Sequence, residues 1–149
     1  RVTQENPLFL QLSEVIDLAM EVGGTEHGFR FIQLPFNLML DQAYLTKNHS
    51  VNGKTISLLE AAQAFNLGVF TSVPLLQGKL LTANVMPEFG DYSTSVRLLQ
   101  FVRSTPGVTA PLIGQKSESH VTENMDIMKI PPLSESEFNE LLKKMVNRS

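Results

Sequence analysis

The stretch that decides the fold runs from Leu67 to Leu80 and reads LGVFTSVPLLQGKL. It opens with a short apolar run, which is typical of a strand buried inside a parallel sheet. The run stops at Pro74, and Gly78 and a second apolar stretch follow. This pattern indicates a strand that ends in a loop facing a ligand, as strands of parallel sheets do.

Two further segments predict strands of the same kind. Residues 29–36 carry bulky apolar side chains and end at Pro35, and residues 108–113 follow the Pro106-Gly107 pair. With residues 68–73 they give three strands at similar separations along the chain. The sequence therefore predicts three consecutive strand–helix units.

Helices are expected between and around these strands, from apolar residues at helical spacing and from capping residues. A Ser-x-x-Glu capping box at Ser134 predicts the start of the last helix. A weaker candidate covers residues 38–47, and residues 49–54 read as a polar loop with an Asn-Gly turn. The other predicted helices cover about residues 10–22, 57–66, 93–104 and 117–125, with Thr55 or Ser57 as the cap of the second.

Sequential strand–helix–strand units imply parallel pairing and right-handed crossovers. A doubly wound sheet fits this order, and so does a segment of a (β/α)8 barrel. A full barrel needs about 250 residues, whereas this chain has 149. Three strands alone would leave two unpaired edges and an uncovered inner face. The fold class is thus α/β, and we expect a part of a larger fold or one that closes on another chain.

Composition narrows the classes of function. The formal net charge of −3 predicts no affinity for nucleic acid or an anionic membrane surface. Cysteine is absent, so no disulfide, thiolate metal site or cysteine nucleophile is expected. No signal peptide or spanning segment is recognisable, and a cytoplasmic location is the expectation. Because the first residue is Arg1 rather than Met, we expect a processed or excised piece of a longer protein.

Several short motifs, taken in order, resemble the C-terminal half of the aldo-keto reductases, which are (β/α)8-barrel oxidoreductases using NADP(H). The resemblance covers nearly the whole chain, residues 1–149, and implies strands six to eight of a TIM barrel with their helices. The motifs are QLPFNL from Gln33, PLLQGKL from Pro74, TPGVT from Thr105, the pair Glu123-Asn124 and PLSE from Pro132.

The resemblance implies that the first two loops bind the cofactor. Gln33 would hydrogen-bond the nicotinamide carboxamide, and an amide side chain has the matching donors and acceptor. The alternative is a polar residue that satisfies nearby backbone at a strand end. The loop after the second strand would lie along the pyrophosphate, where a glycine permits close approach and N–H groups favour an anion. The residues implied in this loop are Ser72, Val73, Leu75, Gly78 and Leu80.

This loop departs from the family pattern. Many members place an aromatic residue and then Ser before the Pro-Leu pair, whereas this chain has Ser72 and Val73. The aromatic platform for the nicotinamide is therefore missing, and Phe36 is the candidate for a substitute apolar wall. Leu75 would pack against the cofactor, or else it belongs to the core.

The third implied group lies on and before the predicted helix 117–125. Glu123 and Asn124 match the pair that contacts the adenine amino group, with Gly114 in the loop before them. His120 stands where many members have Arg, so preference for a 2′-phosphate would depend more on Lys116. NADP(H) is the expected cofactor and NAD(H) stays possible. The alternative is a solvated helix face capped by Ser117.

No catalytic residue is assigned to this chain. In the family, Tyr, Lys, His and Asp from the first four strands supply the acid that hydride transfer to a carbonyl requires. Tyr44 and Tyr92 match no such motif, and His27 and His49 are expected in solvated polar loops. No metal-ligand spacing is present either.

The predicted function is the cofactor-binding portion of an NADP(H)-dependent oxidoreductase that reduces aldehydes or ketones by hydride transfer. The chain alone would be inactive until the N-terminal half of the barrel, or a partner chain, completes it. One alternative is a non-catalytic nucleotide-binding regulatory or interaction module on the same scaffold. Another is a half-barrel that forms a homodimer. The identity of the small carbonyl substrate does not follow from the sequence.

Overall fold

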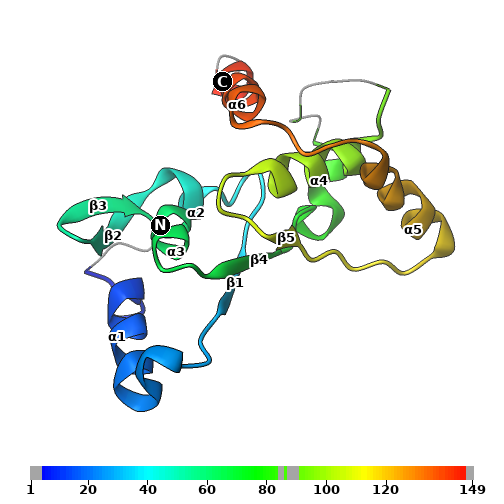
Figure 1. Cartoon of the computed structure of the whole chain (residues 1–149). Helices are drawn as coiled ribbons and strands as arrows, with labels where there is room; N and C mark the ends of the chain where they lie inside the picture. Colours follow the sequence, from blue (N-terminus) through cyan, green and yellow to red (C-terminus); the bar gives the residue numbers. More distant parts are fainter. Residues whose placement is uncertain (1–4, 84–85, 87–90, 147–149) are drawn as a thin grey trace.

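A computed structural model describes residues 5–83, 86 and 91–146 (Figure 1). It is a mixed α/β structure in which α-helices, 3-10 helices (η) and strands alternate. In chain order the elements are α1 (Leu12–Gly23), η1 (Gly24–Glu26), β1 (Phe31–Pro35), α2 (Gln42–Leu45), β2 (Lys47–Val51), β3 (Lys54–Ser57), α3 (Leu58–Ala64), β4 (Gly68–Ser72), η2 (Leu76–Leu81), α4 (Thr94–Ser104), β5 (Ala110–Pro111), α5 (Glu118–Met125), η3 (Asp126–Lys129) and α6 (Glu135–Val146).

The three predicted strands form one parallel sheet in the order β1-β4-β5. The third strand is shorter than predicted, since only Ala110 and Pro111 pair with β4 in the ladder. Proline has no N–H to give to a ladder, which limits the regular pairing. The chain is nevertheless extended on both sides, because the N–H of Thr109 donates to Val69 O and that of Leu112 donates to Thr71 O.

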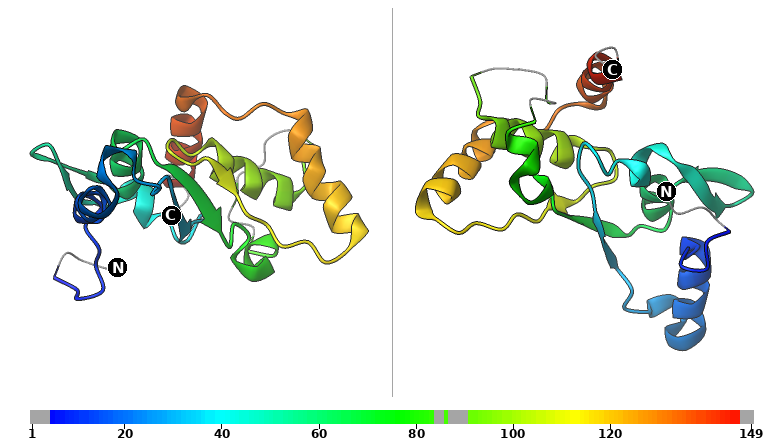
Figure 2. Two further views of the ribbon diagram at one scale, coloured as in Figure 1. Left: turned by 60° about the horizontal axis from the view of Figure 1, so that its bottom comes forward. Right: turned by 180° about the vertical axis from the view of Figure 1, so that it is seen from behind.

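Among the described residues, the helices cover one face of this sheet and leave the other bare. Val69 of β4 is fully buried and belongs to one core cluster with Leu59 of α3 and Phe101 of α4. On the opposite face, Phe31 is 58% exposed and Leu112 is 44% exposed. Within the described residues, β1 and β5 form free edges of the sheet. The expected uncovered face and unpaired edges are confirmed. The two views in Figure 2 show α1 and α5 at opposite ends of the molecule.

Stacked phenylalanines form the centre of the core. The rings of Phe36 and Phe101 lie parallel, with centroids 6.1 Å apart, and Phe138 of α6 packs 5.4 Å from Phe101. All three side chains are buried. The expectation that Phe36 forms a wall of the cofactor site is wrong, because its ring is enclosed between β1, α4 and α6.

The segment after β1 differs most from the sequence prediction. The expected helix over residues 38–47 is reduced to α2, because Asn37 and Leu40 first close a tight turn. The expected polar loop over residues 49–54 is instead an antiparallel hairpin of β2 and β3. Asn52 and Gly53 form its two-residue turn, both with positive φ, as the Asn-Gly signal predicted.

The predicted helix boundaries are largely confirmed by their caps. Ser57 rather than Thr55 begins α3, in a complete capping box with Glu60. Ser134 and Glu137 bond reciprocally at the start of α6, as the sequence predicted. Gly24 ends α1 with a φ of 66°. None of the helices in the described part of the chain is long and apolar enough to span a membrane.

Candidate functional site

The loops after β1 and β4 are joined at the carboxyl ends of their strands. The N–H of Phe36 donates to Ser72 O at 3.1 Å, and Asn37 Nδ2 donates to Val73 O at 2.9 Å. Because all three strands run parallel, the loops that follow them leave the sheet at the same end. This end of the sheet is therefore where side chains from different strands meet.

Gln33 and Ser72 lie on the bare face of the sheet. Gln33 is in register with Phe70, and Pro35 is in register with Ser72. The rings of Phe31 and Phe70 contact each other at 5.5 Å, which places alternate residues of both strands on one face. Gln33 is exposed on that face, so its amide is available to a ligand.

The loop after β4 has an unusual backbone. Its positive φ values belong to Val73 (52°), Leu76 (48°), Gln77 (56°) and Gly78 (85°). A positive φ is rare for a β-branched residue such as Val73, and the following proline disfavours it further. A Cβ added at Gly78 would point into open space, so this glycine is required by its φ, and its surface is free to be approached.

The two leucines predicted for this site differ in their surroundings. Leu75 is half-buried and packs against the core, so one side of it remains accessible. Leu80 is 2% exposed and lies inside the core cluster. Its backbone is enclosed as well, and the Leu80 N–H donates to Leu75 O at 3.3 Å.

The third group of predicted residues gathers on α5. Ser117 caps the helix by accepting the N–H of His120, as predicted, and the side chains of Lys116 and His120 are exposed. Glu123 Oε1 accepts a hydrogen bond from Ser95 Oγ at 2.9 Å, which ties α5 to α4. Sequence reasoning missed this role of Ser95, because a single serine in the predicted helix 93–104 carries no signal for it.

Asn124 and Gly114 complete that group. The side chain of Asn124 is buried, and its Oδ1 has no hydrogen-bond partner among the residues that the structure describes. A buried acceptor without a partner is costly, and it is the kind of atom that a bound donor would satisfy. Gly114 is exposed, with open space where a Cβ would lie.

The structure thus brings the predicted residues into two groups. Gln33 and Ser72 share the bare face of the sheet, and the loop after β4 follows Ser72 directly. The α5 group follows β5, whose chain is joined to β4 by the bond from the Leu112 N–H to Thr71 O. Sequence reasoning missed Asn37, which connects the first two loops.

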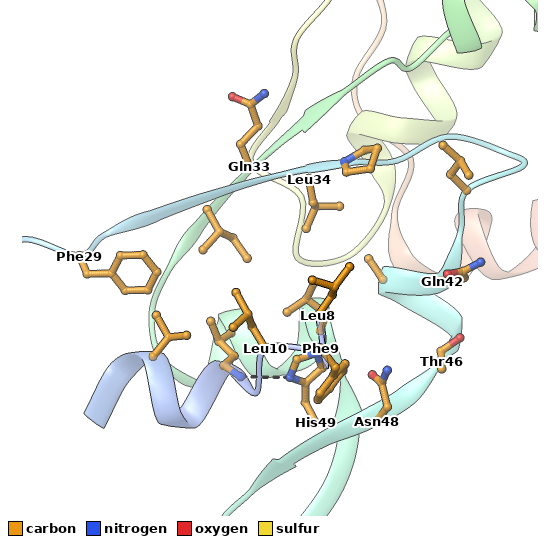
Figure 3. Close-up of a pocket in the computed structure, with 17 residues that line it drawn as sticks. Leu8, Phe9, Leu10, Phe29, Gln33, Leu34, Gln42, Thr46, Asn48 and His49 are labelled. Atoms are coloured by element: carbon orange, nitrogen blue, oxygen red, sulfur yellow. Dashed lines mark hydrogen bonds between the residues drawn. The ribbon is translucent and has the colours of Figure 1, made fainter. Parts of the chain in front are cut away.

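An apolar cavity of about 570 Å3 lies beside β1 (Figure 3). Figure 3 shows Gln33 pointing away from the other labelled side chains, toward the bare face. His49 lines this cavity from β2 and is 3% exposed. The expectation that His49 lies in a solvated loop is wrong, because β2 directs alternate residues inward. His49 and Val51 are the two buried residues of this strand.

The remaining candidates for acid–base chemistry have structural roles. Tyr44 packs edge-on against Phe138. Burial raises the pKa of Tyr44, and the charges of Glu135 and Glu60 add to the effect. His27 is half-buried, with its Nδ1 3.3 Å from Arg30 Nη1. Among the described residues, no three His, Asp or Glu side chains converge on a possible metal site.

Comparison with known proteins gives a likeness in fold. No protein-family model matches the chain, and no curated protein matches it. Among solved structures, an aldo-keto reductase from Bacillus halodurans, in its holo form, matches with a TM-score of 0.57 and 16% identity. The match covers 88% of this chain and 46% of the reductase, so the chain spans about half of that neighbour. The likeness is one of fold alone: a mixed α/β structure with a parallel sheet, consistent with part of a barrel.

Proposed function

We propose that this chain is the cofactor-binding portion of an NADP(H)-dependent oxidoreductase that reduces aldehydes or ketones. The proposal assigns Gln33 to the nicotinamide, the loop after β4 to the pyrophosphate and the α5 group to the adenine end. Its catalytic acid comes from strands outside this chain, which on its own does not turn over. The observation that carries the proposal is that Gln33 shares one face of a parallel sheet with Ser72, which leads directly into the strained Val73 loop.

The likeness to a reductase solved in its holo form supports a dinucleotide as the ligand. Within this chain, the buried Oδ1 of Asn124 supports the adenine end, because the adenine amino group is a hydrogen-bond donor. Glu123 beside it supplies a carboxylate acceptor, already oriented by Ser95. Together they fit a ligand that presents N–H groups to α5.

The bare sheet supports a need for further strands. Phe31 and Leu112 present apolar surface where a closed barrel would have its interior, and β1 has a free edge. The cavity beside β1 is lined mainly by apolar side chains, from Leu8 near the start of the described chain to Leu58 of α3. We infer that the remaining part of the barrel pairs with β1 and covers these surfaces.

Cofactor titration of the complete barrel tests this proposal. NADPH fluorescence should report saturable binding, and Gln33→Ala should weaken it about fivefold, since one net hydrogen bond contributes about 1 kcal/mol. Gln42→Ala is the matched control, because this exposed glutamine of α2 lies outside the proposed site. Absence of binding, or equal losses in both variants, would count against the proposal.

The second candidate function is a nucleotide-binding module without catalysis, and one observation favours it. Ser72 and Val73 replace the aromatic-Ser pair found in many aldo-keto reductases. An assay of NADPH oxidation with a panel of simple aldehydes separates the two functions. Cofactor binding without turnover by the complete barrel would favour the module.

A further inference from the structure

Asn37 is a buried asparagine whose side chain makes three hydrogen bonds. It is 0% exposed. Its Oδ1 accepts the N–H groups of Met39 at 2.9 Å and Leu40 at 3.1 Å, while its Nδ2 donates to Val73 O at 2.9 Å. A side-chain amide carries its donor and its acceptor on separate atoms, so it can bond two segments at once. Asn37 therefore links the turn after β1 to the loop after β4.

The residue that Asn37 holds is the strained one. Val73 has a φ of 52° and is followed by Pro74, although both its branched side chain and that proline favour an extended backbone. A residue kept in such a conformation persists only where the surroundings over-determine it. Val73 O accepts two hydrogen bonds, one from Asn37 Nδ2 and one from the N–H of Leu76 at 2.9 Å.

The conformation of Val73 sets the course of the rest of the loop. The Leu76 N–H is bonded back to Val73 O, and Leu75 O accepts from the N–H groups of Gly78 and Leu80. This chain of bonds leaves the α-carbon of Gly78 facing open space. If Val73 relaxed to an extended conformation, its carbonyl would turn away and the Leu76 bond would be lost.

We propose that Asn37 is a positioning residue that clamps Val73 in its positive-φ conformation and thereby presets the loop for the cofactor. The inference rests on the proposed function, in which this loop lies along the dinucleotide. Asn37 itself touches no ligand, because it is enclosed in the core. Its effect on affinity acts through Val73.

The test uses the isosteric variant Asn37→Asp in the complete barrel. The variant retains an acceptor for Met39 and Leu40 but places a second oxygen against Val73 O. We expect hydrogen exchange of the Leu76 amide to rise about tenfold and NADP+ affinity to fall about tenfold. Asn66→Asp is the matched control, since Asn66 is exposed, also has a positive φ and lies outside the loop; it should change neither quantity.

A second variant separates positioning from general stability. Glycine adopts a positive φ without strain, so adding Val73→Gly to Asn37→Asp should recover most of the lost affinity. Unchanged NADP+ affinity in Asn37→Asp overturns the inference. A second result would also overturn it: the added Val73→Gly does not restore NADP+ affinity, and hydrogen exchange rises evenly over all amides. Asn37 would then have only a general structural role.

The outcome for the unchanged protein distinguishes this inference from the proposed function. If the wild-type barrel does not bind NADP+, the proposed function fails, and with it the assignment of the clamp to a cofactor. Hydrogen exchange of the Leu76 amide tests separately whether the hydrogen bond from Asn37 holds the conformation of Val73. Normal NADP+ binding in both the wild type and Asn37→Asp would leave the proposed function intact and reject the clamp.

Discussion

The backbone N–H of Leu12, at the start of α1, donates a hydrogen bond of 3.3 Å to Nδ1 of His49 on β2. Phe9 packs its ring 5.1 Å from the same imidazole. Because Nδ1 acts as an acceptor, the imidazole must be neutral in this arrangement. One side chain of the hairpin thus fixes the beginning of the first helix.

This contact predicts a loss of stability in acid. Burial lowers the pKa of His49 below its ordinary value of 6.5. The stabilisation that neutral His49 provides is therefore complete at a pH above the pKa of this histidine in the unfolded chain. It is lost as the pH falls through the lower pKa of the folded state. We expect urea denaturation to show less stability at pH 5.5 than at pH 7.5.

The variant His49→Phe should flatten this pH dependence. It keeps a ring against Phe9 but leaves the Leu12 N–H without its acceptor, which costs about 1–3 kcal/mol at pH 7.5. His120→Phe, at an exposed position, should retain the wild-type profile. An unchanged slope in His49→Phe would mean that another group causes the acid sensitivity.

Gly107 should not tolerate a side chain. Its φ is 89°, and an added Cβ would lie 3.0 Å from Leu59 Cβ and 3.2 Å from Leu59 O. Gly107→Ala should lower the free energy of unfolding by about 1–3 kcal/mol, from backbone strain alone. Gly114→Ala is the control, since its Cβ would meet open space; equal effects in both would refute the steric argument.

Self-association of the isolated chain should depend on the edge of β1. Phe31 is 58% exposed on that edge strand, and an exposed apolar edge is a template for pairing with another chain. Phe31→Lys should reduce the larger species seen by sedimentation velocity. Leu18→Lys removes an apolar side chain of similar exposure from α1 instead, and it should have the smaller effect.

Cofactor preference should depend on Lys116. This exposed lysine precedes α5 and is the cation assigned to the 2′-phosphate, a group that NADH lacks. In the complete barrel, Lys116→Ala should weaken NADPH about three- to tenfold and leave NADH nearly unchanged, with the difference shrinking at high salt. Lys129→Ala, at an exposed position that bonds Asp126, is the control. Parallel losses for both cofactors would contradict the assignment.

Local signals were sufficient for most elements of the fold. Caps at Ser57, Ser93, Ser117 and Ser134 begin helices where the sequence predicted them, because each satisfies N–H groups with its own side chain. The hairpin could not be predicted because β2 has a polar residue, His49, at a buried position. The burial of His49 depends on its contact with the start of α1. Such a contact between distant segments leaves no local pattern.

The candidate site, like the fold, could be predicted only where local signals determine it. Strand alternation and chain order were enough to place Gln33 and Ser72 on one face of the sheet. The conformation of Val73 was not predictable, because its own preferences and those of Pro74 oppose a positive φ. A tertiary hydrogen bond from Asn37 outweighs them. The assignment of these residues to a cofactor stays a prediction.

The proline at the end of β1 restricts the register of any strand that joins the free edge. Arg30 O accepts from Gly68 N–H and Phe36 N–H donates to Ser72 O, so even-numbered residues of β1 bond to β4. Phe31 and Gln33 therefore turn their N–H and C=O groups outward, whereas Pro35 offers a carbonyl alone. A strand added there finds its last donor at Gln33, so the residue proposed to bind nicotinamide also marks where the next ladder must stop.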